Sequence, residues 1–294
     1  MSNISDRSAK NSKLSIVIPA KNEQRPIESL IYSLRERLGN PRIIVVDDGS
    51  SDDTAAVACK AGALVISHPV SKGNGAAVKT GVRAASGDVI VFMDADGQHD
   101  PADIPALLAR LDEGYDMVVG ARQAGSQASL GRGLANRFYN RLASYMTGHK
   151  VEDLTSGFRA VRAEKFREFL YLLPNGFSYP TTSTMAFFRA GYSVAYEPIH
   201  AARRIGKSHI RPLHDGLRFL LIIFKIGTLY SPLKLFAPAA ALMFLLGSLW
   251  YLHTFIHFGR FTNMSALLYT GSVVVFMMGL ISEQITALMY KERE

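Results

Sequence analysis

Short apolar runs alternate with segments of helical spacing over the first 120 residues of the chain. The runs that fit strands occupy residues 15–19, 42–46, 63–67, 88–93 and 115–120. Helical spacing of apolar side chains is found between them, at residues 23–38, 52–61 and 74–85, and Ser50 or Ser51 is the expected N-cap of the second helix. Unbroken apolar strands are typical of a sheet covered on both faces. The alternation predicts an α/β fold with a doubly wound, Rossmann-like, mainly parallel sheet.

The pattern changes after residue 212. Residues 217–236 mix long apolar runs with Arg218, Lys225 and Lys234, which predicts a helix lying at a membrane surface. A buried core helix is the alternative. We therefore expect an interfacial amphipathic region at 213–235.

Two long apolar segments follow, at residues 236–258 and 266–289. Each is long enough to cross a hydrocarbon core of about 30 Å. The loop between them carries Arg260 as its only basic residue, whereas basic residues flank the outer ends. By the positive-inside rule, this asymmetry predicts a transmembrane hairpin at 236–294 with both ends in the cytoplasm.

Charge and cysteine content narrow the partners and the compartment. The 294 residues carry a formal net charge of +8, which favours an acidic partner such as nucleic acid, anionic lipid or a phosphorylated substrate. Cys59 is the only cysteine, so no intrachain disulfide and no thiolate metal site is expected. The first thirteen residues are polar and predict no signal peptide. We expect a polar tail at 1–12 and an α/β domain at 13–212 that stays in the cytoplasm.

A cluster of acids follows the fourth predicted strand. Asp94 and Asp96 stand one residue apart at its carboxyl end, with Gln98 close behind. Oxygen ligands suit Mg²⁺ or Mn²⁺, and a Mg²⁺ held by one or two carboxylates usually completes its shell with phosphate oxygens. A chance DxD in a turn is the alternative. An EF-hand loop is excluded, because Pro105 stands where its bidentate glutamate is required.

Polar and charged residues also follow the other predicted strands, where ligands bind in sheets of this kind. They are Pro19, Lys21 and Glu23 after the first strand, Asp47 and Asp48 after the second, Lys72 and Lys79 after the third, and Arg122 after the fifth. The helix start near residue 74, with two glycines next to it, suits a phosphate. Each residue alone is explained as part of a solvated turn. Five such turns in register predict a single ligand site.

Neither GxGxxG nor GxxxxGK[ST] follows the first strand, which disfavours a dinucleotide or P-loop site. The stretches SIVIPAKNE, VVDDGSSDDT, GDVIVFMDADGQHDP and DLTSGFR instead resemble the family 2 glycosyltransferases of the GT-A fold. Within that family the chain is most similar to the dolichol-phosphate mannose synthases and bacterial polyprenyl-phosphate glycosyltransferases. The resemblance covers residues 13–209.

The resemblance implies a role for each group of rim residues. Pro19, Lys21 and Glu23 would line the nucleoside pocket, and Asp47 would read the base. Asp94 and Asp96, with Gln98 near, would hold Mg²⁺ or Mn²⁺ on the diphosphate. The full set expected to bind the nucleotide sugar is Pro19, Lys21, Glu23, Asp47, Asp48, Lys72, Asp94, Ala95, Asp96, Arg122, Arg203 and Ser208.

The segment ARRIGKSH at 202–209 resembles the RxxGxS segment of the family, which closes over the donor phosphates. Arg203 and Ser208 are therefore candidates, and Arg203 joins Asp94 and Asp96 as an expected catalytic residue because a guanidinium suits bidentate phosphate contact. The chain departs from the family pattern in two places. His209 replaces the usual lysine, and the helix after residue 177 reads SYPTTSTMAFF without the expected glutamate. The QxxRW signature of processive synthases is absent.

These features predict a membrane-bound, inverting hexosyltransferase. It would transfer one sugar from a UDP-glucose or GDP-mannose type of donor to undecaprenyl or dolichyl phosphate. One alternative is transfer to a hydroxyl acceptor, which needs a general base such as Asp153 or Asp100. The other is a non-catalytic nucleotide-sugar sensor or membrane scaffold.

Three arginines, Arg132, Arg137 and Arg141, lie in a segment that reads as an amphipathic helix and are candidates to hold the acceptor phosphate. A solvated basic face is the alternative. Membrane lipids are expected partners and nucleic acid is not, because the chain has no nucleic-acid motif; self-association stays open. The expected location is the bacterial inner membrane, with the catalytic domain in the cytoplasm.

Overall fold

The computed structural model describes residues 14–39, 41–122, 130–176, 178–200, 224, 227–228 and 231–291. The chain divides into two compact units. The first consists of Met1–Tyr145 with His149–His209, and the second of Met146–Gly148 with Ile210–Glu294. The predicted interfacial helix at 217–236 lies mostly outside the described residues.

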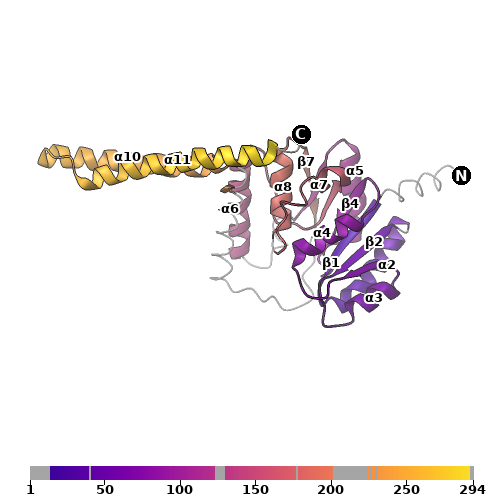
Figure 1. Ribbon diagram of the computed structural model, residues 1–294. Helices are drawn as coiled ribbons and strands as arrows, with labels where there is room; N and C mark the ends of the chain where they lie inside the picture. The colour runs from indigo at the N-terminus through magenta and orange to yellow at the C-terminus, as the bar shows by residue number, and fades with distance from the viewer. Residues whose placement is uncertain are drawn as a thin grey trace. The chain divides into compact units, whose positions relative to one another are not determined.

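A single sheet of seven strands, in the order β3-β2-β1-β4-β6-β5-β7, forms the centre of the first unit as far as it is described (Figure 1). The strands are β1 (Leu14–Ala20), β2 (Arg42–Asp47), β3 (Leu64–Ser67), β4 (Val89–Phe92), β5 (Met117–Arg122), β6 (Arg159–Arg162) and β7 (Val194–Ile199). Pairing is parallel between β1 and β2, β1 and β4, β2 and β3, and β5 and β7. The strand β6 is antiparallel to its neighbours β4 and β5. The prediction of an α/β, mainly parallel sheet is confirmed.

Helices cover both faces of this sheet because the strands are apolar on both. On one face, α2 (Gln24–Leu38), α3 (Thr54–Lys60) and α5 (Ile104–Asp112) share a buried core with Ile16 and Val118 of the strands. The short helix η1 (Pro101–Asp103) leads into α5.

The opposite face is covered by α4 (Asn74–Ala84), α7 (Ala163–Arg167) and α8 (Tyr179–Arg189). Helix α4 lies so close to β1 that a Cβ on Gly81 would sit 2.3 Å from Cγ1 of Val17. Phe92 of β4 packs against Phe166 of α7, with ring centroids 4.8 Å apart. A further helix, α6 (Leu130–Thr147), follows β5.

The start of α3 differs from the prediction. Its N-cap residue is Asp53, and neither serine caps it. The hydroxyl of Ser50 instead donates to Asp47, and the N–H of Ser51 donates to Oδ1 of Asn22 at 2.8 Å. The predicted N-cap is therefore wrong. Both serines instead bond to Asn22, so they connect the loop after β2 to the loop after β1.

The described part of the second unit contains a pair of long helices, α10 (Pro232–Phe258) and α11 (Asn263–Lys291). Both are long and apolar enough, by length and composition, to be candidate membrane spans. Glycines allow close packing between them: a Cβ on Gly279 would lie 2.7 Å from Cβ of Phe236, and one on Gly271 would lie 2.6 Å from Cε of Met243. The carboxylate of Glu283 accepts the N–H of Leu233 at 3.2 Å, which satisfies a donor in the first turn of α10.

Candidate active site

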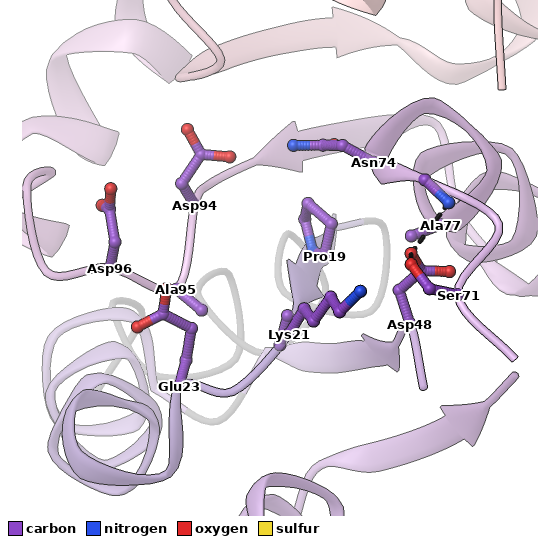
Figure 2. A pocket seen from close by; sticks show the side chains of 12 residues that line it. Pro19, Lys21, Glu23, Asp48, Ser71, Asn74, Ala77, Asp94, Ala95 and Asp96 are labelled. Atoms are coloured by element: carbon purple, nitrogen blue, oxygen red, sulfur yellow. Dashed lines mark hydrogen bonds between the residues drawn. The ribbon is translucent and has the colours of Figure 1, made fainter. Parts of the chain in front are cut away.

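The carboxyl ends of β1, β2 and β4, with the loop after β3, surround a cavity of about 370 Å³ (Figure 2). Carboxylate, amine, amide and hydroxyl groups reach it from these loops, as expected for strands that end at one edge of a parallel sheet. The lining residues are Pro19, Ala20, Lys21, Glu23, Asp48, Ser71, Gly73, Asn74, Ala77, Asp94, Ala95 and Asp96. Seven of the predicted donor-site residues are thus brought together: Pro19, Lys21, Glu23, Asp48, Asp94, Ala95 and Asp96.

Asp94 and Asp96 reach the cavity on either side of the buried Ala95, and both are half-buried. Figure 2 shows their carboxylates on the same side of the cavity as Glu23. The backbone N–H of Gln98 donates to Oδ1 of Asp96 at 3.2 Å and so helps fix the turn that carries this acid.

The two acids fit a divalent cation that is shared with a ligand. Within the described residues no group of three or more His, Cys, Asp or Glu side chains converges to hold a metal by itself. Mg²⁺ commonly takes one or two protein carboxylates and fills its remaining positions with water and phosphate oxygens. Asp94 and Asp96 are such a pair on an open cavity, and the half-buried Gln98 follows directly.

The loop after β1 is held by the loop after β2. Asn22 has a positive φ of 56° and donates its N–H to Oγ of Ser50 at 3.0 Å. Glu23 donates its N–H to Oγ1 of Thr54 at 2.9 Å. Because both loops are cross-linked in this way, the position of Glu23 at the cavity is set by the β2–α3 turn as well as by β1.

Asp48 lines the cavity, but protein groups already bind its carboxylate. It pairs with Nδ1 of His68 at 2.8 Å and accepts from Oγ of Ser71 at 2.7 Å. The N–H groups of Lys72 and Gly73 also donate to it, each at 2.8 Å. Burial opposes ionisation of this group, but these hydrogen bonds outweigh it and lower the pKa of Asp48 to about 2. Asp48 therefore shapes the β3–α4 loop.

Asp47 is buried, and its Oδ1 accepts the N–H of Ser50 at 3.1 Å. It is not one of the residues that line the cavity. The base-reading role that the resemblance implies for Asp47 therefore has no direct support in the cavity lining.

The N-terminus of α4 differs from the expected phosphate site. The N–H groups of Gly75 and Ala76 donate to the carbonyls of Gly176 and Asn175, at 3.1 and 2.8 Å. Lys79 donates to Oδ1 of Asn175, so it fastens the same loop. These two N–H groups and this ammonium are engaged by the protein, so the phosphate role expected for the start of α4 stays a prediction. The exposed Lys72 contributes its backbone N–H to Asp48.

The half-buried Arg122 forms an ion pair with the buried Asp153. Its Nε and Nη2 donate to the two carboxylate oxygens at 2.8 and 2.9 Å, and Nη2 also donates to Oγ1 of Thr155. Burial would raise the pKa of Asp153, but Arg122 and backbone N–H groups hold it below its usual range. A carboxylate held in this way is a poor general base. Arg122 does not line the cavity, although Asp94 is close enough to favour its charged form.

His99 lies next to the acidic turn. It is buried, its ring stacks on Phe158 with centroids 5.0 Å apart, and its Nδ1 has no hydrogen-bond partner. Burial holds the pKa of His99 well below its usual range, so the imidazole is neutral near pH 7.

Sequence reasoning missed five lining residues, Ala20 at the end of β1 and Ser71, Gly73, Asn74 and Ala77. The last four belong to the loop and helix start after β3, where the polar and glycine pattern SKGNG was the available signal. Figure 2 shows the Asn74 side chain extending into the cavity from α4.

Several predicted residues lie outside the described residues or away from the cavity lining. Arg203, Ser208 and His209 lie outside the described residues. Arg132 belongs to α6, but its side chain is outside the described part. Arg137 and Arg141 are exposed on the same helix.

The sheet order and the acid-lined cavity at its carboxyl edge define a GT-A glycosyltransferase. Solved structures of glucosyl-3-phosphoglycerate synthase from Mycobacterium tuberculosis share the fold. The complex with phosphoglyceric acid is 26% identical, with a TM-score of 0.59 over 75% of this chain and 81% of that one. The complex with Mn²⁺ and uridine-diphosphate-glucose is 28% identical, with a TM-score of 0.57 over 76% of this chain and 82% of that one.

Residues 15–170 match the model of glycosyl transferase family 2, and residues 231–288 match the GtrB C-terminal hairpin. The chain belongs to glycosyl transferase family 2. It is 32% identical over 247 residues to undecaprenyl-phosphate 4-deoxy-4-formamido-L-arabinose transferase of Klebsiella pneumoniae, covering 80% of this chain and 73% of that one. It is also 35% identical over 163 residues to uncharacterized protein MJ1222 of Methanocaldococcus jannaschii, covering 53% and 67%.

The family and the GT-A fold expected from the four sequence stretches are confirmed. The chain is a nucleotide-sugar-dependent glycosyltransferase, with two apolar C-terminal helices that are candidate membrane spans.

Proposed function

We propose that this protein is a membrane-anchored, inverting glycosyltransferase that moves one sugar from a nucleoside diphosphate sugar to a polyprenyl phosphate. The match of residues 231–288 to the GtrB C-terminal hairpin carries this proposal. The similarity to the undecaprenyl-phosphate sugar transferase supports it, because it extends over 80% of the chain and thus beyond the family match at 15–170.

The donor occupies the cavity at the edge of the sheet. Asp94 and Asp96, assisted by Gln98, hold Mg²⁺ or Mn²⁺, which when bound offsets the charge of the diphosphate as it leaves. Pro19, Lys21 and Glu23 take the nucleoside. The related solved structures with uridine-diphosphate-glucose and Mn²⁺ support a uridine nucleotide as the first donor to test. The remaining donor assignments, Asp47, Lys72, Arg122, Arg203 and Ser208, stay proposals carried by the resemblance.

A phosphate acceptor suits this site, because the two carboxylates considered as general bases, Asp153 and Asp100, already bind protein groups. A lipid monophosphate has a second pKa of roughly 6, judged from phosphorylated side chains, so it arrives ionised and needs no residue to remove a proton. A sugar hydroxyl does need such a base. Asp153 is committed to Arg122, and exposed Asp100 uses Oδ1 to cap η1 through the Ala102 N–H at 2.8 Å.

Positive charge for the acceptor phosphate comes from α6. Arg137 and Arg141 are exposed one turn apart on this helix, and Arg132 precedes them. A guanidinium binds phosphate through two parallel hydrogen bonds.

The membrane part consists of α10 and α11, each exposing apolar side chains along its length. We assign a hairpin with both chain ends and the catalytic domain (13–212) in the cytoplasm, and an interfacial region at 213–235. In a bacterium, the membrane that this hairpin would cross is the inner membrane. The rule that basic residues stay on the cytoplasmic side supports this orientation.

The test uses the full chain in detergent or nanodiscs with Mg²⁺ or Mn²⁺ and a panel of labelled nucleotide sugars. Three acceptors are compared: a polyprenyl phosphate, the matching polyprenol, and phosphoglyceric acid. We expect label in an organic-extractable lipid only with the polyprenyl phosphate. Transfer to polyprenol identifies a hydroxyl acceptor, and transfer to phosphoglyceric acid identifies the acceptor of the soluble relatives. Donor binding without any transfer or donor hydrolysis identifies a scaffold.

The same assay tests the role of α6. Arg137→Ala should raise the KM for polyprenyl phosphate severalfold and leave the KM for the donor unchanged, because only the acceptor loses a charge partner. Arg37→Ala is the matched control, an exposed arginine near the C-terminal end of α2. Equal effects of the two substitutions would remove α6 from the acceptor site.

A further inference from the structure

The carboxylate of Asp94 lies directly against the main chain of Gly157. A Cβ built on Gly157 would sit 2.8 Å from Oδ2 and 3.3 Å from Cγ of Asp94. Real Cβ atoms do not approach an oxygen this closely, so only glycine leaves room for the carboxylate where it stands. Gly157 belongs to the DLTSGFR stretch and lies 63 residues after Asp94 in the chain.

Tyr179 fixes the position of Gly157 through a hydrogen bond. Its hydroxyl donates to the carbonyl of Gly157 at 2.9 Å, and its ring lies against Phe92, with centroids 5.9 Å apart. Phe92 ends β4, two residues before Asp94. The side chain is buried, and burial raises the pKa of Tyr179, so the hydroxyl keeps its proton and remains a donor. Tyr179 therefore contacts both chain segments that meet at Asp94.

Arg159 fixes the same stretch through α8. Its fully buried guanidinium donates through Nη1 to Oγ of Ser183 at 2.8 Å and to Oγ1 of Thr184 at 3.1 Å, and through Nη2 to the carbonyl of Ser156. It also lies over the Tyr179 ring, 5.8 Å from the centroid. A buried cation requires such compensation, and within the described residues no carboxylate forms an ion pair with it.

These contacts give the unusual sequence of α8 a role. The helix reads YPTTSTMAFFR, and its residues from Tyr179 to Phe187 are all buried. Its hydroxyls and the carbonyl of Pro180 hold Arg159, and Arg159 holds Ser156, the residue before Gly157. A chain of contacts thus runs from α8 to the Asp94 carboxylate.

We propose that Gly157 and Tyr179 are positioning residues that set the place of the Asp94 carboxylate and thereby the affinity of the site for its divalent cation with nucleotide. This rests on the proposed function, in which Asp94 is a ligand of that cation. Groups that orient metal ligands without touching the metal commonly change its affinity by about 10–100-fold when altered.

The Gly157→Ala variant should fold, because the added methyl meets the end of a flexible side chain, which can rotate away. Rotation would take Asp94 out of position. Tyr179→Phe removes one hydroxyl and leaves the ring packing intact. We expect the dissociation constant of Mn²⁺ in the presence of UDP to rise about tenfold or more for Gly157→Ala, and by a smaller factor for Tyr179→Phe.

Mn²⁺ binding is measured on the full chain by electron paramagnetic resonance of the free ion, with and without UDP, and with UDP alone as a blank. Gly176→Ala is the glycine control, since a Cβ there meets nothing within 4 Å. Tyr192→Phe is the tyrosine control, because its hydroxyl bonds to Glu168 at 2.8 Å. Thermal unfolding of each variant reports the fold.

Asp94→Ala is the reference for interpretation. If it leaves Mn²⁺ binding unchanged, the cation site of the proposed function is wrong. If it weakens binding while folded Gly157→Ala and Tyr179→Phe match their controls, the positioning role is wrong and the cation site stands. If Gly157→Ala unfolds, Tyr179→Phe decides the question alone.

Discussion

The ion pair between the half-buried Arg122 and the buried Asp153 allows a sharp test of what the DLTSGFR stretch does. Removing one partner by Asp153→Ala leaves a guanidinium that is only 26% exposed without its carboxylate. It also removes the acceptor for the N–H groups of Thr155 and Ser156, both at 3.1 Å. We expect a large loss of stability, because the remaining charge and donors stay buried.

The size follows from the geometry. Two unit charges about 4 Å apart attract by about 4 kcal/mol at an effective dielectric constant of about 20, and desolvation of both groups offsets much of this gain. Deleting one member of a buried pair nevertheless costs about 3–5 kcal/mol, since the other is left uncompensated. In a domain of this size, each kcal/mol lowers the melting temperature by about 2–4 °C, so Asp153→Ala should lower it by about 10 °C.

The assay is a double-mutant cycle with Arg122→Ala and Asp153→Ala, followed by thermal unfolding of the full chain in detergent. The double variant should be little less stable than Asp153→Ala, giving a coupling of about 3 kcal/mol. Glu152→Ala is the control, because Glu152 pairs with Lys150, which is 84% exposed, and exposed pairs contribute about 1 kcal/mol or less.

The pH dependence has a definite sign. The folded-state pKa of Asp153 lies below its unfolded value of about 3.9, so the pair stabilises the fold above about pH 4. That contribution is lost as the pH falls through the folded-state pKa. The stability difference between the unaltered chain and Asp153→Ala should therefore shrink below about pH 4. Additive single costs, or a difference that grows in acid, would refute the reasoning.

Three further predictions concern the metal, the topology and the hairpin. Asp94→Ala or Asp96→Ala should remove most transfer with the melting temperature unchanged, and EDTA should do the same reversibly; full turnover in EDTA would contradict the metal assignment. The exposed Cys59 should react with an impermeant thiol reagent only from the cytoplasmic side, whereas Thr262→Cys in a chain lacking Cys59 should react only from the other side. Labelling of both cysteines from the same side would rule out the hairpin. Glu283→Ala should destabilise the hairpin by about 1–3 kcal/mol and Glu283→Gln by less, measured by unfolding in micelles, because glutamine can still accept the Leu233 N–H; equal losses would assign the effect to charge.

The sequence was sufficient for features that depend on local pattern. Four of the five early strands, β1, β2, β4 and β5, are apolar runs that are buried over most of their length, so their existence follows from burial on both faces. The edge strand β3 is only partly buried and was predicted from its apolar residues alone. The strands β6 and β7 were not predicted. The strand β6 is short, begins and ends with arginine, and pairs antiparallel with strands distant in the chain, and β7 is partly exposed and contains Glu197 and Pro198. Such a pairing leaves no period along the sequence.

At the cavity, the sequence by itself determined which residue types meet, since parallel strands deliver their following loops to one edge. Asp94, Asp96, Lys21 and Glu23 were placed correctly for this reason. Only the tertiary structure decided which polar groups face the ligand and which hold the fold. Asp48 is bound by the loop after β3, and Arg122 by Asp153, 31 residues later in the chain. A polar group whose hydrogen-bond partner lies far away in the sequence cannot be recognised from its neighbours in the chain. Any donor or acceptor that the fold brings close in space, from backbone or side chain, can satisfy it.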